Sequence, residues 1–247
     1  MDHQKIKNEF LRIKSLGYLA NVKSDINDGA AGNTFEHHLG VKENNLRDPD
    51  FEQFEVKTKK QVSKAHITLF SQKPTYPSDG DNYMRNNYGI PDEEFPNINV
   101  FRTSIYAHRW SFVYNRFNFK IDVNFKDNKV YVLKADKDFK ILDKAVYWDF
   151  QDIINGTKKL NNLFVVKANE KLIGNKAHFE YPNASVFIDY IGDQNFINLL
   201  STGVIRYDNR LGIYRTGDKT GSAHNHGGAF RIAPKDIGQL FKTKIEI

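Results

Sequence analysis

The chain has 247 residues, with 36 lysines and arginines against 30 acidic residues, a net charge of +6 and no cysteine. The absence of cysteine excludes disulfides and thiolate metal sites, so any metal ion would need oxygen or nitrogen ligands. Because no apolar run is long enough to cross a membrane and residues 1–4 begin no apolar signal region, we expect a soluble cytoplasmic protein. The positive charge fits a polyanionic partner.

The first forty residues predict two helices. Ile6, Phe10 and Ile13 recur at helical spacing, which is typical of an amphipathic helix with one packed face. After a loop that contains glycine, a second and shorter helix is expected over residues 33–39, where it would end at Gly40.

Residues 54–59 alternate between uncharged and charged side chains, which predicts a strand with one face on a core. Glu55 and Lys57 then share the open face, roughly 7 Å apart. Asp50 lies five residues upstream, so two carboxylates and an ammonium would gather at the rim of one sheet. Mg²⁺ prefers one or two carboxylates together with water and phosphate oxygens, and such a site activates water and clamps a phosphodiester.

A simpler interpretation of the same residues, as an exposed strand face without a site, stays open. The acid-x-Lys pattern also occurs at residues 127–129, in an expected hairpin turn, and at residues 138–140, in a polar loop. At both places we expect solvated charges. Taken alone, Glu55-Val56-Lys57 is therefore also compatible with an ordinary exposed strand face.

The middle of the chain predicts alternating strands and helices. We expect residues 65–70 to form a strand that pairs with residues 54–59. Residues 71–99 are polar and contain proline and glycine, which predicts a long loop that could act as a flap. The further expected elements are a hairpin over 117–133, a helix over 148–159, strands at 163–168 and 186–190, and a helical piece at 196–200.

Near the C-terminus, polar side chains share faces of extended chain. Residues 204–215 read as a bent strand or a hairpin, on which Asp208 and Arg210 point the same way. His224 and His226 likewise share a face, and Arg231 follows. Such a set holds the donors and acceptors that reading of DNA base edges requires.

Other interpretations of this segment compete with base reading. The two histidines could hold a metal ion, but no third ligand stands near them, and they could simply decorate a glycine-rich loop. The contiguous letters His-Asn-His do not make an HNH nuclease, whose residues are spread over a ββα unit. Residues 217–220 lack the spacing of a phosphate-binding P-loop.

The segment Asp50-x4-Glu55-Val56-Lys57 resembles the PD-(D/E)xK nuclease motif. Before it, Gly29-x-x-Gly32-x-Thr34-x-Glu36 is similar to the stretch that precedes the catalytic strand of MutH-like nucleases. Together with residues 204–233, these features resemble the MvaI/BcnI group of type II restriction endonucleases, relatives of the mismatch-repair nickase MutH.

The resemblance implies an α/β (α+β) fold with a mixed sheet flanked by helices and a C-terminal DNA-recognition lobe that forms a cleft. It places a catalytic lobe at residues 1–165 and the recognition lobe at 166–247. It implies Mg²⁺ held by Asp50, Glu55 and the Val56 carbonyl, with Lys57 beside the attacking water and Glu36 orienting a water or a second ion. Base contacts are carried over to Asp208, Arg210, His224, His226 and Arg231.

The implied activity is hydrolysis of double-stranded DNA at a short site resembling CC(A/T)GG, leaving a 5′-phosphate and a 3′-hydroxyl. A monomer would cut the two strands one after the other, and the host would need a cognate DNA methyltransferase. Two alternatives stay open: a MutH-like nickase of mismatch repair, and a DNA-binding module that has lost catalysis.

Overall fold

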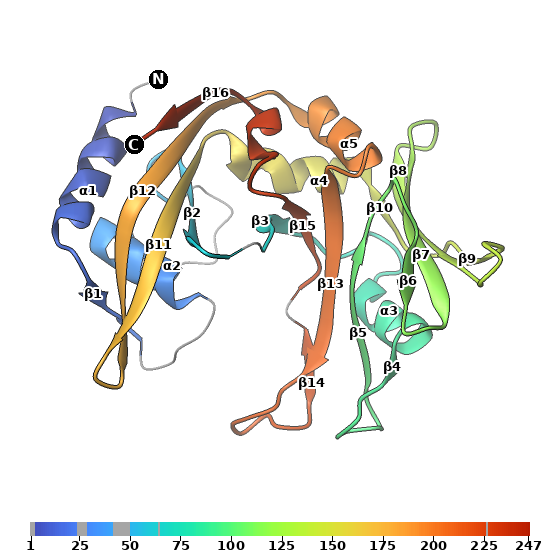
Figure 1. Ribbon diagram of the computed structural model, residues 1–247. Helices are drawn as coiled ribbons and strands as arrows, with labels where there is room; N and C mark the ends of the chain where they lie inside the picture. Colours follow the sequence, from blue (N-terminus) through green and yellow to red (C-terminus); the bar gives the residue numbers. More distant parts are fainter. Residues whose placement is uncertain (1–2, 24–28, 42–49, 64, 226) are drawn as a thin grey trace. The chain divides into compact units, whose positions relative to one another are not determined.

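A computed structural model describes residues 3–23, 29–41, 50–63, 65–225 and 227–247 (Figure 1). The helices are α1 (Gln4–Ser15), α2 (Ala30–Leu39), α3 (Gly80–Tyr88), α4 (Phe150–Thr157) and α5 (Asp193–Ser201), with 3₁₀ turns η1 (Lys158–Leu160) and η2 (Ile237–Leu240). The strands are β1 (Leu19–Ala20), β2 (Glu55–Lys60), β3 (Ile67–Ser71), β4 (Ile90–Pro91), β5 (Asn99–Ile105), β6 (Ser111–Val113), β7 (Phe117–Asn124), β8 (Lys129–Ala135), β9 (Ile141–Asp143), β10 (Tyr147–Asp149), β11 (Leu163–Ile173), β12 (Lys176–Tyr190), β13 (Ile205–Ile213), β14 (Ala223–Asn225), β15 (Ala229–Ile232) and β16 (Phe241–Glu246). The expected mixed α and β fold is confirmed.

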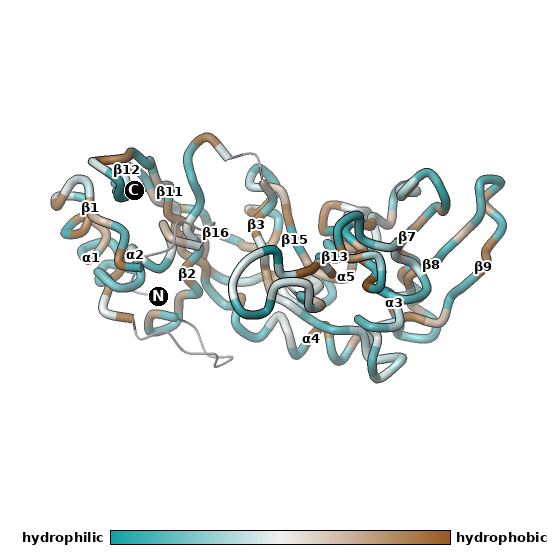
Figure 2. Tube along the Cα trace, turned by 90° about the horizontal axis from the view of Figure 1, so that it is seen from below, coloured by the Kyte–Doolittle hydropathy of each residue, from teal (hydrophilic) through white to brown (hydrophobic). Residues whose placement is uncertain are grey.

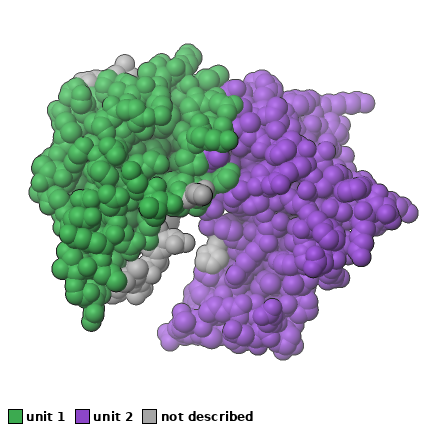
Figure 3. Space-filling model, viewed as in Figure 1, with its two compact units in different colours: residues 1–67, 158–191, 234–247 green, residues 68–157, 192–233 purple. Residues whose placement is uncertain are grey.

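The chain forms two compact units (Figure 3). Unit 1 comprises residues 1–67, 158–191 and 234–247, and unit 2 comprises residues 68–157 and 192–233. These units differ from contiguous lobes at 1–165 and 166–247, because the strands that complete the sheet of unit 1 come from later parts of the chain. Which unit is catalytic and which reads DNA stays a prediction.

Unit 1 is built on a sheet in the order β1-β12-β11-β2, with β16 also paired to β12. The edge strand β2 runs parallel to β11, with Glu55 opposite Leu163. The expected pairing of residues 65–70 with this strand is wrong, because β3 pairs with β15 in another sheet. Strand β2 pairs instead with β11, which lies far along the chain and runs parallel to it.

One face of this sheet packs against α1 and α2. Phe10 and Phe35 contact Phe164 of β11 at ring-centroid distances of 5.9 and 6.1 Å, and Val56 of β2 joins the same core. Since side chains alternate along a strand, Glu55 and Lys57 take the opposite face. The predicted helices are confirmed, and α2 ends at Gly40, whose positive φ of 81° suits a glycine.

Unit 2 contains two sheets. One has the order β3-β15-β13-β5-β4 with β14 paired to β13, and the other has the order β10-β8-β7-β6 with β9 paired to β8. The predicted hairpin over 117–133 is confirmed as β7 and β8. The core of the unit is aromatic. The ring centroids of Trp148 and Tyr207 lie 4.5 Å apart, and those of Phe70 and Phe230 lie 5.3 Å apart.

The expectation of a long loop over 71–99 is wrong, because this stretch contains α3. Met84 and Tyr88, four residues apart, are buried and give the helix an apolar contact that the polar composition hid. The Tyr88 ring packs against the rings of Phe101 and Phe119, at centroid distances of 5.8 and 5.2 Å. Tertiary packing therefore overrides the turn-like composition.

Hydropathy varies over short distances along the trace, with brown and teal residues interspersed (Figure 2). Among the helices that the structure describes, none is both long and apolar enough to cross a membrane.

Candidate functional site

A tight turn brings Asp50 back to the start of β2. Phe51 and Phe54 exchange two backbone hydrogen bonds of 3.0 and 2.8 Å, so the chain reverses between them. The Val56 N–H then donates to Asp50 Oδ2 over 2.9 Å. The spacing of five residues between Asp50 and Glu55 thus closes into one local cluster.

Glu55 is the buried centre of this cluster. Its side chain is only 2% exposed, and the Lys57 Nζ lies 2.5 Å from its Oε1. Lys159 of η1 places its Nζ 2.7 Å from the same oxygen. The other oxygen, Glu55 Oε2, is buried and has no hydrogen-bond partner among the described residues.

The pKa of Asp50 is shifted by its place in this cluster. Burial, and then the neighbouring charge of Glu55, raise the pKa of the Asp50 carboxyl. The Val56 N–H and the two lysine ammoniums act in the opposite direction without cancelling that rise. Burial is the largest cause of this rise, and a bound cation would offset it.

These residues fit a divalent metal ion. The described residues contain no group of three or more His, Asp or Glu side chains that could hold a metal. Mg²⁺, however, needs only one or two carboxylates, and it completes its shell with water and substrate phosphate. Asp50 and the partnerless Glu55 Oε2 supply that oxygen set.

Glu36 approaches β2 from the helix side. A side chain on Gly32 would lie 3.8 Å from both Glu36 Oε1 and the Thr58 Cβ, so Glu36 stands on the Thr58 side of the strand. Glu55 and Lys57 take the other side. The predicted catalytic role of Glu36 stays a prediction. Glu36 also lines a hollow of about 130 Å³ with Val22, Lys23, Asn33, His37 and Val41.

A second charged cluster lies on the β13 sheet of unit 2. Alternation along β13 puts Arg206, Asp208 and Arg210 on one face, and Arg231 of β15 stands opposite Arg206. The Arg231 Nη1 lies 3.3 Å from Asp208 Oδ2. The Arg206 Nε lies 2.8 Å from Asp208 Oδ1, as an ion pair whose angle falls short of a hydrogen bond. Two guanidiniums, those of Arg206 and Arg231, thus contact one carboxylate.

The guanidinium of Arg210 is partly withdrawn from water. Its Nη2 donates to the Gly227 carbonyl over 3.3 Å. Burial first, and then the charge of Arg231, lower the pKa of this guanidinium. The predicted set Asp208, Arg210 and Arg231 is therefore brought together on one face.

Arg102 of β5 extends the same face, since it is paired with Arg210 across the strands. Its guanidinium lies over Gly212, where an added Cβ would stand 2.3 Å from the Arg102 Nη2. The glycine leaves room for the planar group to lie flat on the strand.

His224 of β14 stacks on Tyr214, with ring centroids 3.8 Å apart and planes 9° apart. Burial, followed by the charges of Arg102, Lys219 and Arg85, lowers the pKa of His224. A neutral imidazole offers one donor and one acceptor. His226 lies outside the described residues.

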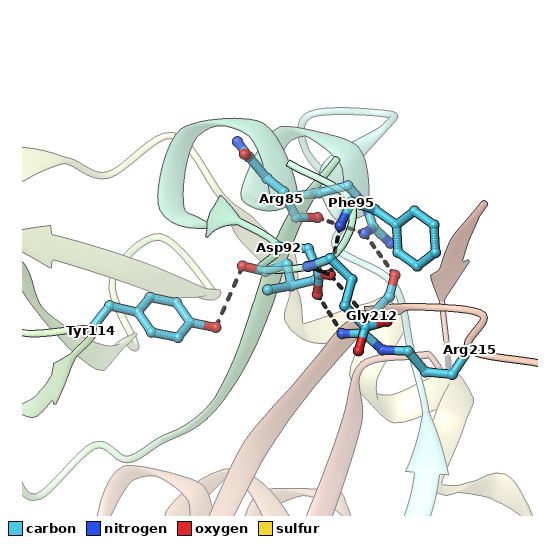
Figure 4. Close-up of polar contacts among 9 residues, drawn as sticks. Arg85, Asp92, Phe95, Tyr114, Gly212 and Arg215 are labelled. Atoms are coloured by element: carbon cyan, nitrogen blue, oxygen red, sulfur yellow. Dashed lines mark hydrogen bonds and ion pairs between the residues drawn. The ribbon is translucent and has the colours of Figure 1, made fainter. Parts of the chain in front are cut away.

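Buried and paired arginines hold the β13–β14 connection in place (Figure 4). Arg85 donates from Nη1 to the carbonyls of Asn99 and Gly212 over 2.8 and 3.0 Å. Arg215 forms a two-pronged pair with Asp92, at 2.8 and 2.5 Å. These contacts fix the strand ends from which His224 and its neighbours project.

Sequence reasoning missed three of these residues. Arg206 shares the alternation of Asp208 and Arg210, so its sequence position signalled the same face. Lys159 and Arg102 carried no local signal. Their places depend on the pairing of β11 with β2 and of β5 with β13.

Comparisons with known proteins identify the family of this chain. The profile of the MvaI/BcnI restriction endonuclease family matches residues 7–241. A solved complex of restriction endonuclease MvaI with cognate DNA substrate is 28% identical, covers 100% of this chain and 99% of that chain, and has a TM-score of 0.90. MvaI in the absence of DNA is also 28% identical, covers 100% and 98%, and has a TM-score of 0.61. Among curated proteins, no match was found.

The family match spans nearly the whole chain, and the resemblance seen in the motifs is confirmed. The chain belongs to the MvaI/BcnI family of type II restriction endonucleases, which are site-specific deoxyribonucleases.

Proposed function

We propose that this enzyme hydrolyses double-stranded DNA in a Mg²⁺-dependent reaction at a short site resembling CC(A/T)GG, leaving a 5′-phosphate and a 3′-hydroxyl. The observation that carries the proposal is the Asp50–Glu55–Lys57 cluster, in which a buried carboxylate oxygen has no described partner. The DNA-bound structure of a similar restriction endonuclease supports a duplex as substrate.

Each residue of the cluster has a role that follows from its place. Asp50 and Glu55, with the Val56 carbonyl, would hold the divalent ion at the scissile phosphate. When bound, the ion polarises the phosphate and offsets the charge that develops on it. The Lys57 ammonium favours hydroxide over water beside the phosphate and stabilises the added negative charge of the transition state. Glu36 would orient a metal-bound water or a second ion.

The arginine-rich face of unit 2 supplies sequence reading. Arg210 and Arg231 present the forked donors that pair with guanine O6 and N7, whereas Asp208 is an acceptor suited to cytosine N4. His224 and His226 would contact a base or a phosphate. We further propose a cytoplasmic monomer that cuts the strands in turn, with a cognate methyltransferase protecting the host DNA.

Incubation of supercoiled plasmid of known sequence with Mg²⁺, and in parallel with EDTA, tests this proposal. We expect discrete fragments that map to CC(A/T)GG-like sites with Mg²⁺ and intact plasmid with EDTA. Nicked circles alone would instead identify a nickase of the MutH type. A mobility shift without cutting under both conditions would identify a DNA-binding module without catalysis.

A further inference from the structure

Lys159 is a cation of the catalytic cluster that the motif does not contain. It lies in η1, immediately before β11, and its Nζ is 2.7 Å from Glu55 Oε1. The Lys57 Nζ lies 2.5 Å from the same atom. The Lys159 and Lys57 side chains are 26% and 25% exposed, against 2% for Glu55, so both ammoniums reach inward from a partly wet rim.

The segment that carries Lys159 also fixes the main chain of Glu55. The Glu55 N–H donates to the Asn162 carbonyl over 3.0 Å. The Asn162 side chain donates to the Gln53 carbonyl over 3.3 Å, so the residues on both sides of the strand entry are held. Residues 158–162 therefore set the position of Glu55 through its backbone and its carboxylate together.

Two ammoniums on one oxygen leave the carboxylate asymmetric. Oε1 is saturated, whereas Oε2 is buried and has no partner among the described residues. Asp50 and Glu55 together carry two negative charges when both are ionised, and Lys57 alone provides one unit of positive charge. A second ammonium at 2.7 Å keeps Oε1 occupied when Lys57 turns toward another group.

We propose that Lys159 is a positioning residue of the nuclease site: it anchors Glu55 through Oε1, leaves Oε2 to the divalent ion, and weakens the binding of that ion by charge repulsion. The inference rests on the metal role proposed above for Asp50 and Glu55. It predicts an uncommon pair of effects, because removal of the ammonium makes the metal bind more tightly while the carboxylate is held less well.

The test compares Lys159→Gln with Lys158→Gln, which removes the same charge from the adjacent, exposed residue of η1. Titration calorimetry with Mn²⁺ alone, in the absence of DNA, measures metal affinity. We expect Lys159→Gln to lower the dissociation constant about threefold to thirtyfold, as expected for one like charge removed from a partly screened site. Lys158→Gln should leave it unchanged.

Single-turnover cleavage of a duplex provides the second readout. We expect Lys159→Gln to cut on the order of tenfold more slowly at saturating Mn²⁺, because a misplaced metal ligand loses alignment. Lys159→Arg keeps the charge, so its Mn²⁺ affinity should stay near that of the wild type while its cleavage rate recovers in part. A residue that only stabilises the fold would weaken metal binding when removed, not strengthen it.

Three results would overturn the inference. One is a folded Lys159→Gln variant that binds Mn²⁺ no more tightly than the wild type. Another is cleavage by Lys159→Gln at the wild-type rate. If Lys159→Gln does not fold, Lys159→Arg decides, and a clear change in the Mn²⁺ affinity of that charge-conserving variant is the third. A wild-type protein that binds no Mn²⁺ would overturn the proposed metal site as well, which separates the failure of the two proposals.

Discussion

The cluster around Glu55 in unit 1 and the cluster around Asp208 in unit 2 each hold one buried carboxylate between cationic side chains. They differ in the surroundings of the polar atoms that lack a hydrogen-bond partner. Glu55 Oε2 is buried and has no described hydrogen-bond partner. Asp208 Oδ1 also lacks a described hydrogen bond, but the Arg206 Nε lies 2.8 Å from it, and the Arg231 Nη1 lies 3.3 Å from Oδ2. The first cluster therefore leaves an acceptor available, whereas the second leaves the Nε donors of Arg206 and Arg231 without hydrogen bonds to described residues.

The choice of cation matches this difference. Lysine is a compact, strongly hydrated point charge, whereas arginine presents a rigid planar fork that suits two adjacent acceptors. Lys57 and Lys159 both converge on one atom, while Arg206 and Arg231 spread around a carboxylate on a flat strand face. Under the proposed function, the same charges serve hydrolysis in one setting and recognition in the other.

Lys57→Ala should give the largest effect and separate the two clusters most sharply. Loss of a donor that stabilises the charge developed in the transition state should slow cleavage by about 10²- to 10³-fold. Duplex affinity, measured by mobility shift in EDTA, should change little. The control is Lys60→Ala on the same strand, whose ammonium pairs with Glu170 at 2.5 Å and whose loss should leave cleavage within a few-fold. Equal losses of binding and cleavage in Lys57→Ala would contradict the assignment.

Arg231→Ala tests the other half of the comparison. Loss of a forked donor to a base edge should weaken binding of the specific duplex by about 1–3 kcal/mol and relax discrimination at that position. A scrambled duplex should lose less, because it never gains the base contact. The control is Lys126→Ala, an exposed lysine in the β7–β8 turn of unit 2. An equal loss on specific and scrambled DNA would reassign Arg231 to a phosphate.

The sequence predicted the elements whose periodicity is strong. The helical spacing of Ile6, Phe10 and Ile13 became a helix with one buried face. The alternation at 54–59 became strand β2, but its expected open face is not open, because Glu55 and Lys59 are buried there. It failed for α3, where two buried residues in a polar stretch decide the structure, and for the partner of β2. These failures share a cause, since burial against distant residues is invisible to local composition.

The same limit divides the candidate site. Asp50, Glu55 and Lys57 were predictable because a turn of four residues and one strand bring them together. Lys159 comes from more than a hundred residues further along the chain, and only the parallel pairing of β11 with β2 puts it there. A motif therefore marks where a site starts, and the sheet topology completes it.

Gly212→Ala should give a smaller effect that depends on Arg102. The new methyl would stand 2.3 Å from the Arg102 Nη2, so the flexible end of that side chain must move off the strand. We expect specific binding to weaken about twofold to fivefold, a loss below the range for a direct base contact, with an almost unchanged melting temperature. Gly212→Ala should add nothing to Arg102→Ala in the double variant. Additive losses would show that the glycine acts on something other than Arg102.

Asp50→Asn should give the smallest effect, on the stability of the metal-free protein. Burial, and then Glu55, raise the pKa of the Asp50 carboxyl in the folded state, so its stabilising contribution is present at low pH and is lost as pH rises through that pKa. An asparagine stays neutral and can still accept the Val56 N–H.

At neutral pH in EDTA, Asp50→Asn should therefore melt a few degrees higher than the wild type. The difference should shrink as the pH falls below about 3.9, where an ordinary aspartate is protonated in both folded and unfolded chains. The exposed residue Asp138 provides the control, since Asp138→Asn should shift melting at neither pH. Added Mn²⁺ should raise the melting temperature of the wild type more than that of Asp50→Asn, because only the aspartate offers the ion a charge. A metal-free Asp50→Asn variant that melts below the wild type at neutral pH would mean that the lysines over-compensate the carboxylates, and the cluster would then have no need of a cation.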